Sequence, residues 1–172
     1  MTTPPGTFAL RDATEADLPA IVAIYNSTIA SRMVTADLEP VMVEARRAWF
    51  LAHQVRARPL WVACDAGGTV CAWLSFDTFF PRAAYDGTAM IGLYVGPDHR
   101  RRGLGRYLLQ AAIARAPSLG LHTVLGYIFG HNEPSLQLFA AHGFVRWGHL
   151  PRIAVLDGVE RDLIIVGRRL EV

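Results

Sequence analysis

The sequence predicts a single α/β domain in which helices cover both faces of a mixed sheet. Strand-like and helix-like segments follow one another in the order β-α-α-β-β-β-α-β-α-β-β, and no repeat, low-complexity segment or linker separates them. Of the 172 residues, 52% are hydrophobic and 19% are charged, as in an ordinary globular protein with a sizeable core. We expect one domain over residues 1–172, with an ordered core of about 8–170.

Charge and hydropathy exclude two classes of function. The net charge of +2 is too small for a nucleic-acid-binding surface, and the basic triplet at 100–102 is a local feature. No apolar run approaches the roughly 18 residues that cross a bilayer. The N-terminal residues also lack the basic-then-apolar pattern of a signal peptide. We therefore expect a cytoplasmic protein without nucleic-acid or membrane partners.

The first third of the chain predicts one strand and two helices. Residues 8–11 form a short strand, and Thr14 followed by Asp17 marks the start of a helix. Apolar residues then recur at helical spacing, and Pro19 is tolerated because it lies near the helix start. A second helix is expected over about 41–55.

Two strands, 60–65 and 69–76, flank a glycine pair and predict a hairpin with a two-residue turn. This register places Cys64 opposite Cys71. A cross-strand disulfide is conceivable, but reduced, buried thiols are favoured in a reducing cytosol. Neither the cysteines nor the histidines show metal-ligand spacing along the sequence, so no metal site is expected.

The second half alternates strands and helices after a loop at 79–87. Glycines mark the boundaries, because Gly96 ends a strand while Gly120 and Gly143 follow helices. The expected elements are strands 88–95, 121–129, 144–150 and 162–169 and helices 103–115 and 132–142.

The most informative stretch is residues 91–105, which read IGLYVGPDHRRRGLG. A short apolar strand is followed by an arginine-rich turn with the pattern R-x-x-G-x-G, from Arg100 to Gly105, and then by an amphipathic helix. Successive backbone N–H groups, the helix dipole and glycines that allow close approach form a cradle for an anion. We expect a phosphate-bearing cofactor to bind there.

Three phosphate-binding patterns can be compared with this stretch. It lacks the G-x-x-x-x-G-K-[ST] of a P-loop, and Leu108 stands where a dinucleotide fingerprint has its third glycine. The remaining pattern, R-x-x-G-x-G between a strand and a helix, resembles the coenzyme-A pyrophosphate loop of the GCN5-related N-acetyltransferase (GNAT) superfamily. A second block, Asn132-x-x-Ser135 followed by LQLFAAHGF, is similar to the signature that closes the cofactor site in that superfamily.

The resemblance covers nearly the whole chain. Segments such as TEADLPAIVAIYN and GLHT are most similar to the phosphinothricin and methionine-sulfoximine acetyltransferase branch. It implies a GNAT fold, with a mostly antiparallel sheet of six to seven strands whose central strands, 88–96 and 121–129, splay apart. It also implies acetyl-CoA as the co-substrate.

The resemblance further implies roles for individual residues. Backbone groups of Leu93 and Val95 would pair with the pantetheine arm, and the Leu93 N–H would stabilise the oxyanion. Asn132 would bond the pantetheine amides and Ser135 would lie beside the arm or the diphosphate, although Asn132 could be only a helix cap and Leu93 only sheet core. The residues expected at the pyrophosphate are Arg100, Arg101, Arg102, Gly103, Leu104 and Gly105.

The expected acid and base are both absent. A lysine-like amine of pKa about 10 is only about one part in a thousand neutral at pH 7, so a general base helps. The related branch has a glutamate where this chain has Met90, and many members have a tyrosine acid where it has Phe139. The general base stays open among Asp77, Asp86, Tyr94, His131 and Glu133.

On the substrate side, Arg82 is expected to bind a carboxylate or phosphinate, because a guanidinium recognises such groups with two parallel hydrogen bonds. The alternative is a solvent-facing loop arginine. Tyr85 would form part of the pocket wall, and Thr88 and Met90 would line the amine side.

These features predict an acetyl-CoA-dependent N-acetyltransferase for a small amino-acid-like amine of the phosphinothricin or methionine sulfoximine type. Two alternatives stay open. The missing acid–base pair suggests a non-catalytic acyl-CoA sensor, and the scaffold also suits a protein or peptide N-acetyltransferase. Related enzymes are commonly homodimers, and the apolar C-terminal strands agree with a homodimer here.

Overall fold

The computed structural model describes residues 8–171, which form one seven-stranded sheet in the order β1-β2-β3-β4-β5-β7-β6. Residues 1–7 and Val172 of the predicted domain lie outside the described residues. The strands are β1 (Ala9–Asp12), β2 (Leu60–Cys64), β3 (Val70–Thr78), β4 (Thr88–Val95), β5 (Thr123–Phe129), β6 (Val145–Leu156) and β7 (Val159–Arg169).

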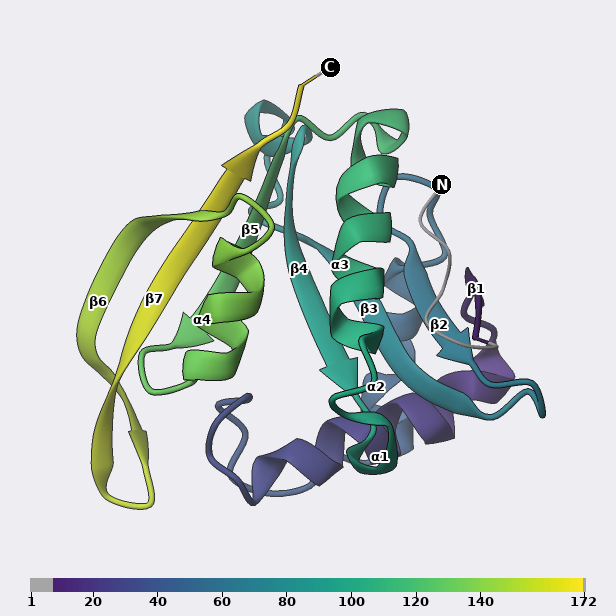
Figure 1. Ribbon diagram of the computed structural model, residues 1–172, viewed down its shortest axis with the longest axis horizontal. Coiled ribbons are helices and arrows are strands. Elements are labelled where there is room, and N and C mark those ends of the chain that lie inside the picture. Colours follow the sequence, from purple (N-terminus) through teal and green to yellow (C-terminus); the bar gives the residue numbers. More distant parts are fainter. Residues whose placement is uncertain (1–7, 172) are drawn as a thin grey trace.

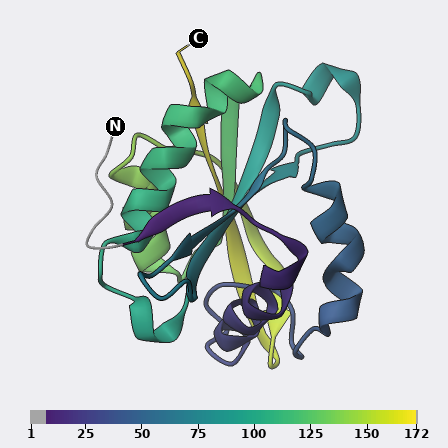
Figure 2. The same cartoon turned by 90° about the vertical axis from the view of Figure 1, so that its right-hand side faces the viewer.

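Helices cover both faces of the sheet, as predicted (Figure 1, Figure 2). Helices α3 (Leu104–Arg115) and α4 (Glu133–Ala140) lie on one face, and α1 (Leu18–Ile29) and α2 (Val43–Ala52) lie on the other. In Figure 2 the blue α2 and the green α3 stand on opposite sides of the sheet. Within residues 8–171, no helix has the length and apolar character needed to cross a membrane.

The central strands β4 and β5 are the one parallel pair in the described sheet. Their pairing covers three positions only, from Thr88 opposite Thr123 to Met90 opposite Leu125. Figure 1 shows the two strands diverging beyond that point, toward the end where α3 begins. The predicted splay is therefore confirmed, and it opens the sheet next to the arginine-rich turn.

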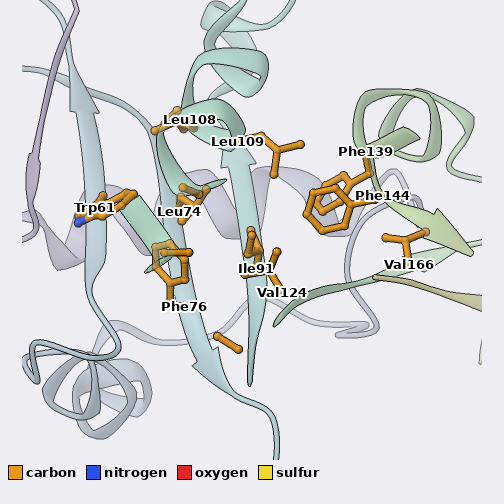
Figure 3. Close-up of a cluster of buried hydrophobic side chains, with 14 of the residues drawn as sticks. Trp61, Leu74, Phe76, Ile91, Leu108, Leu109, Val124, Phe139, Phe144 and Val166 are labelled. Carbon is orange, nitrogen blue, oxygen red and sulfur yellow. The ribbon is translucent and has the colours of Figure 1, made fainter. Parts of the chain in front are cut away.

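Apolar clusters fill both faces of the sheet. Because side chains alternate along a strand, β3 sends Leu74 and Phe76 to the α3 side and Trp73 to the α1 side. Figure 3 shows the α3-side cluster, which also contains Leu108, Val124 and Phe139. The two clusters pack β3 and β4 between two helical layers.

The helix start predicted at Thr14 is a single 3-10 turn, Glu15–Asp17, that leads directly into α1. Asp17 is 7% exposed, and its carboxylate accepts two hydrogen bonds from Arg11, at 2.6 and 2.8 Å, and one from the Thr14 N–H at 2.7 Å. The hydrogen bonds from Arg11 are the main reason that the pKa of Asp17 falls from 3.8 to about 2.

Asp17 gives a pH-dependent stability prediction. A carboxyl with a depressed pKa in the folded state stabilises the fold above its unfolded pKa and loses that contribution as the pH falls through its folded pKa. In Asp17→Asn we expect a loss of about 2 kcal/mol in the free energy of unfolding at pH 6. This difference should shrink from about pH 4 downward and vanish only below about pH 2, as measured by denaturant titrations at each pH. A pH-independent difference would contradict this account.

The β2–β3 hairpin corrects the predicted cysteine register. Asp65 closes a longer turn, in which its N–H donates to the Thr69 carbonyl and its Oδ1 accepts from Gly67 and Thr69. The register then shifts, so that Cys64 lies opposite Val70 and not opposite Cys71. A shift of one residue reverses the side-chain direction, and the two buried, unpaired thiols accordingly belong to clusters on opposite faces.

The C-terminal strands are longer than predicted. The expected strands 144–150 and 162–169 are parts of one long hairpin, which projects beyond the sheet in Figure 1. Asp157 and Gly158 form its turn with φ of 50° and 78°, as a type I′ turn requires. Pairing is irregular between Leu150 and Ala154. The regular alternation of inward and outward side chains is interrupted there, so the sequence does not show one continuous strand.

Candidate functional site

Two backbone N–H groups of β4 face the opening between β4 and β5. In an antiparallel pair, successive residues direct their N–H groups alternately toward and away from the partner strand. Gly96 N–H donates to Cys71 of the β3 segment, so the N–H groups of Leu93 and Val95 point away from β3. On that side β5 has already diverged. The two groups are therefore available to an extended ligand.

The turn that follows β4 has the backbone of an anion-binding site. Arg101 and Gly103 both adopt left-handed conformations, with φ of 58° and 82°, and Gly103 is the N-cap of α3. The first N–H groups of α3, at Leu104 and Gly105, have no partner within the helix, and the helix dipole adds positive potential there. The side chains of Arg100, Arg101 and Arg102 are exposed around this turn.

A cavity of about 670 Å³ connects the turn with the strand opening. It is lined by most of the predicted cofactor residues, namely Leu93, Val95, Arg100, Arg101, Gly103, Leu104, Gly105 and Ser135, but not by Arg102 or Asn132. Thr28 and Val34 also line it from the α1 side, a contribution that the sequence analysis missed because no motif marks it. A smaller cavity of about 70 Å³, lined by Gly92, Leu93 and Asn132 among others, lies between β4 and β5.

Asn132 connects α4 with the segment that follows α1. Its Oδ1 accepts from the Ser135 N–H at 3.3 Å as the N-cap of α4, and its Nδ2 donates to the Met33 carbonyl at 2.9 Å. The helix-cap interpretation is therefore correct. One Nδ2 hydrogen remains for a ligand, because a primary amide has two.

Three of the four predicted substrate residues, Arg82, Tyr85 and Thr88, lie at or beyond the other end of β4, and Met90 lies three residues from Leu93. Arg82 and Tyr85 are exposed in the β3–β4 loop, where Tyr85 contacts Phe79 and Phe80. A strand rises about 3.4 Å per residue, so Thr88 lies about 17 Å along β4 from Leu93. None of the four residues, Met90 included, lines either of the two cavities described above.

The two positions that lack acid–base groups differ in their surroundings. Phe139 is 5% exposed and packs edge-on against Phe144 and over Gly126, where a Cβ would lie 2.8 Å from its ring. Met90 is half-buried on β4, directly opposite Asp77 of β3.

The other residues considered as general base have different environments. Asp86 and Glu133 are exposed, and His131 Nε2 bonds the Arg32 carbonyl at 2.8 Å. Tyr94 stacks on Trp73 with ring centroids 4.3 Å apart, and burial raises the pKa of its hydroxyl.

The fold also places Asp65, Cys71 and His99 together, with ligand atoms within 4.8 Å of one another. Spacing along the sequence did not indicate this proximity. The Asp65 carboxylate already accepts two hydrogen bonds within its turn, and the Cys71 thiol donates to the Thr69 carbonyl at 3.2 Å. Burial raises the pKa of Cys71, which disfavours the thiolate that metals require. We assign no metal to this cluster.

Comparisons with known proteins agree with this geometry. The model of the acetyltransferase (GNAT) family matches residues 21–144. A Bacillus subtilis protein provisionally named phosphinothricin acetyltransferase YwnH is 55% identical over 161 residues, covering 94% of this chain and 98% of the relative. The L-methionine sulfoximine/L-methionine sulfone acetyltransferase of Pseudomonas paraeruginosa is 36% identical over 163 residues, covering 95% of each chain.

A solved structure extends the agreement to the cofactor. The crystal structure of a GNAT superfamily phosphinothricin acetyltransferase from Sinorhizobium meliloti in complex with acetyl-CoA superposes with a TM-score of 0.89 at 28% identity. The match covers 95% of this chain and 89% of that one. The open sheet, the anion cradle and the family match together lead to one conclusion: the chain belongs to the GNAT family of N-acetyltransferases, and acetyl-CoA is its co-substrate.

Proposed function

We propose that the 670 Å³ cavity is where acetyl-CoA binds and reacts with a small amino-acid-like amine. The observation that carries this proposal is the opening of the sheet beyond Met90, which leaves the N–H groups of Leu93 and Val95 unpaired beside the anion cradle of α3. The cradle from Arg100 to Gly105 holds the pyrophosphate, and the extended arm runs along β4 as an added strand would.

Leu93 has the central role in the chemistry of this proposal. Its N–H donates a hydrogen bond to the thioester oxygen as negative charge develops there. Because β4 and β5 have already diverged at Leu93, this N–H is unpaired and oriented before the ligand binds. Ser135 and the remaining Nδ2 hydrogen of Asn132 orient the arm from the α4 side. A turnover assay with acetyl-CoA and a panel of amines, phosphinothricin and L-methionine sulfoximine among them, tests the proposal through release of the coenzyme A thiol.

We further propose that Arg82 binds the acidic group of the amine when the β3–β4 loop folds over the substrate. This role is consistent with an exposed side chain that has no ion-pair partner among the described residues. In Arg82→Ala we expect KM for an amine with a carboxylate or phosphinate to rise about 10- to 100-fold, because a bidentate ionic contact is lost. KM for acetyl-CoA should stay unchanged. Steady-state kinetics with both substrates varied checks this, and equal effects on both KM values would contradict it.

A second candidate function follows from Met90 and Phe139, which leave two acid–base positions without a titratable group. A non-catalytic acyl-CoA sensor would bind acetyl-CoA but release no thiol with any amine in the panel. A peptide N-acetyltransferase would instead accept only peptide amines in the same assay. Calorimetry combined with the turnover panel separates the three functions.

We also propose that the enzyme is a homodimer and works in the cytoplasm. Several apolar side chains on the β6–β7 hairpin are exposed, including Trp147, Ile153 and Val155, and such a patch is typical of an interface. The two buried, unpaired cysteines are compatible with a reducing compartment. Sedimentation analysis measures the oligomeric state directly.

A further inference from the structure

The carboxylate of Asp77 lies on the face of the sheet that α1 and α2 cover, and three side chains hold it. Trp49 Nε1 donates a hydrogen bond to Oδ1 at 3.0 Å, and the Ser75 hydroxyl donates to Oδ2 at 2.5 Å. His53 Nε2 lies 3.2 Å from Oδ1. The carboxylate is fixed in place by these groups, yet 28% of the side-chain surface of Asp77 remains exposed. An ordered carboxylate with an open side can receive a ligand.

The contacts of His53 determine where its protons are. Its Nδ1 lies 2.7 Å from the Trp49 carbonyl oxygen, and because a carbonyl can only accept, Nδ1 carries a hydrogen. Its Nε2 is buried and has no hydrogen-bond partner of good geometry within residues 8–171. The nearest acidic group to Nε2 is the Asp77 carboxylate. Among the acidic groups of residues 8–171, His53 Nε2 therefore faces the Asp77 carboxylate alone.

Asp77 is ionised at neutral pH. Burial works against its charge, but the close contact with His53 and the hydrogen bonds from Ser75 and Trp49 outweigh that effect and lower the pKa of Asp77. A partly buried carboxylate that stays charged attracts a cation such as a protonated amine.

Asp77 is also close to the reacting position. It lies opposite Met90, and a Cβ built on Gly92 would lie 3.5 Å from Asp77 Oδ2. Adding standard bond lengths, Oδ2 is no more than about 8 Å from the Leu93 nitrogen. An amine nitrogen about 2.9 Å from Oδ2 and about 3 Å from a thioester carbon, whose oxygen accepts from Leu93, fits within this span.

Resting on the acetyl-transfer function proposed above, we propose that Asp77 is the catalytic residue that binds the substrate amine and accepts its proton. Its three neighbours, His53, Trp49 and Ser75, are positioning residues. Asp77 supplies from β3 the carboxylate that β4 lacks at Met90, because the two residues are cross-strand neighbours on the same face.

The proton and bond changes balance without any further reactant. The bound ammonium loses one proton to water, and the neutral amine then attacks the thioester carbon, so that a C–N bond forms. As the nitrogen becomes positively charged, its second proton moves to Asp77. The C–S bond breaks, and coenzyme A leaves as a thiolate that takes a proton from water. Asp77 returns its own proton to water, and the products are the amide and the free thiol.

Asp77→Asn tests the proposal, because it keeps the side-chain size and removes the base. We expect kcat with L-methionine sulfoximine or phosphinothricin to fall about 100-fold or more. The Kd of acetyl-CoA, measured by calorimetry, should stay within about twofold, and the affinity for the amine alone should fall. Adding Met90→Glu to Asp77→Asn should restore at least about tenfold in kcat, since residue 90 faces the same space. The matched control is Asp12→Asn, an exposed aspartate on β1, which should leave every constant unchanged.

Two results would overturn the proposal. One is a folded Asp77→Asn enzyme whose kcat stays within about threefold of the parent. The other comes from Ser75→Ala and Trp49→Phe, which keep the proposal testable if Asp77→Asn does not fold. Each should lower kcat about tenfold at unchanged KM for acetyl-CoA, and unchanged kcat in both would refute the assignment. A parent protein that fails to bind acetyl-CoA would contradict the proposed function itself and is recognised by calorimetry before any variant is made.

Discussion

Gly105→Asp is expected to raise KM for acetyl-CoA about 100-fold, a loss of about 2.7 kcal/mol in binding. Gly105 occupies the first turn of α3 and lines the large cavity, where a Cβ would point toward Leu138 and Leu93 at 3.3 and 3.7 Å. A carboxylate there competes with the pyrophosphate for the same N–H groups and repels its charge. Calorimetry with acetyl-CoA and steady-state kinetics measure the effect.

The matched control is Gly105→Asn, which has the same size without the charge. We expect its KM to rise about tenfold at most, so the remaining difference reports on anion binding alone. Equal KM values for the two variants would show that the pyrophosphate lies elsewhere.

Phe139→Ala is expected to lower the free energy of unfolding by about 3–5 kcal/mol. The ring is 5% exposed, packs on Phe144 with centroids 4.8 Å apart, and fills the space over Gly126. Its removal leaves a cavity in the centre of the α3-side cluster. For a chain of this length, a loss of that size lowers the thermal midpoint by roughly 6–20 °C, which calorimetry or circular dichroism measures.

Phe139→Leu serves as the control for this prediction. It keeps much of the apolar volume, and we expect it to cost less than about half as much as the alanine variant. A loss below about 1 kcal/mol in Phe139→Ala would mean that α4 contributes little to the core, contrary to its packing on β5.

The sequence predicted β4 and the adjoining helix α3 better than the two hairpins. Strand 88–95 and the adjoining helix were predicted almost to the residue, because glycines, proline and apolar periodicity agree there. The cysteine register was wrong because a bulge after Ala63 changes the pairing, and a bulge has no signal in a single sequence. The C-terminal hairpin was predicted too short, although the Asp157-Gly158 pair marks its turn.

The candidate site shows a similar division. Motifs selected residues that mostly line one cavity, since backbone geometry at a glycine-rich turn depends on local sequence. The carboxylate network around Asp77 depends on contacts between α2 and β3, such as Trp49 with Asp77 across 28 residues, and such pairs carry no local pattern. Arg82 does not line the cavity, because it lies in the β3–β4 loop beyond the far end of β4, and its resemblance to the related branch carried no information about this distance.

The short parallel contact between β4 and β5 has a thermodynamic consequence. A fully zipped sheet would satisfy the amides of Leu93 and Val95 within the polypeptide, whereas here water has to solvate them in the ligand-free enzyme. The ligand-free sheet lacks the stabilisation of two backbone hydrogen bonds at its centre, and the two N–H donors are free to pair with the ligand that we propose for this opening. In the proposed complex, the amides of the bound ligand complete the backbone pairing that β5 does not provide.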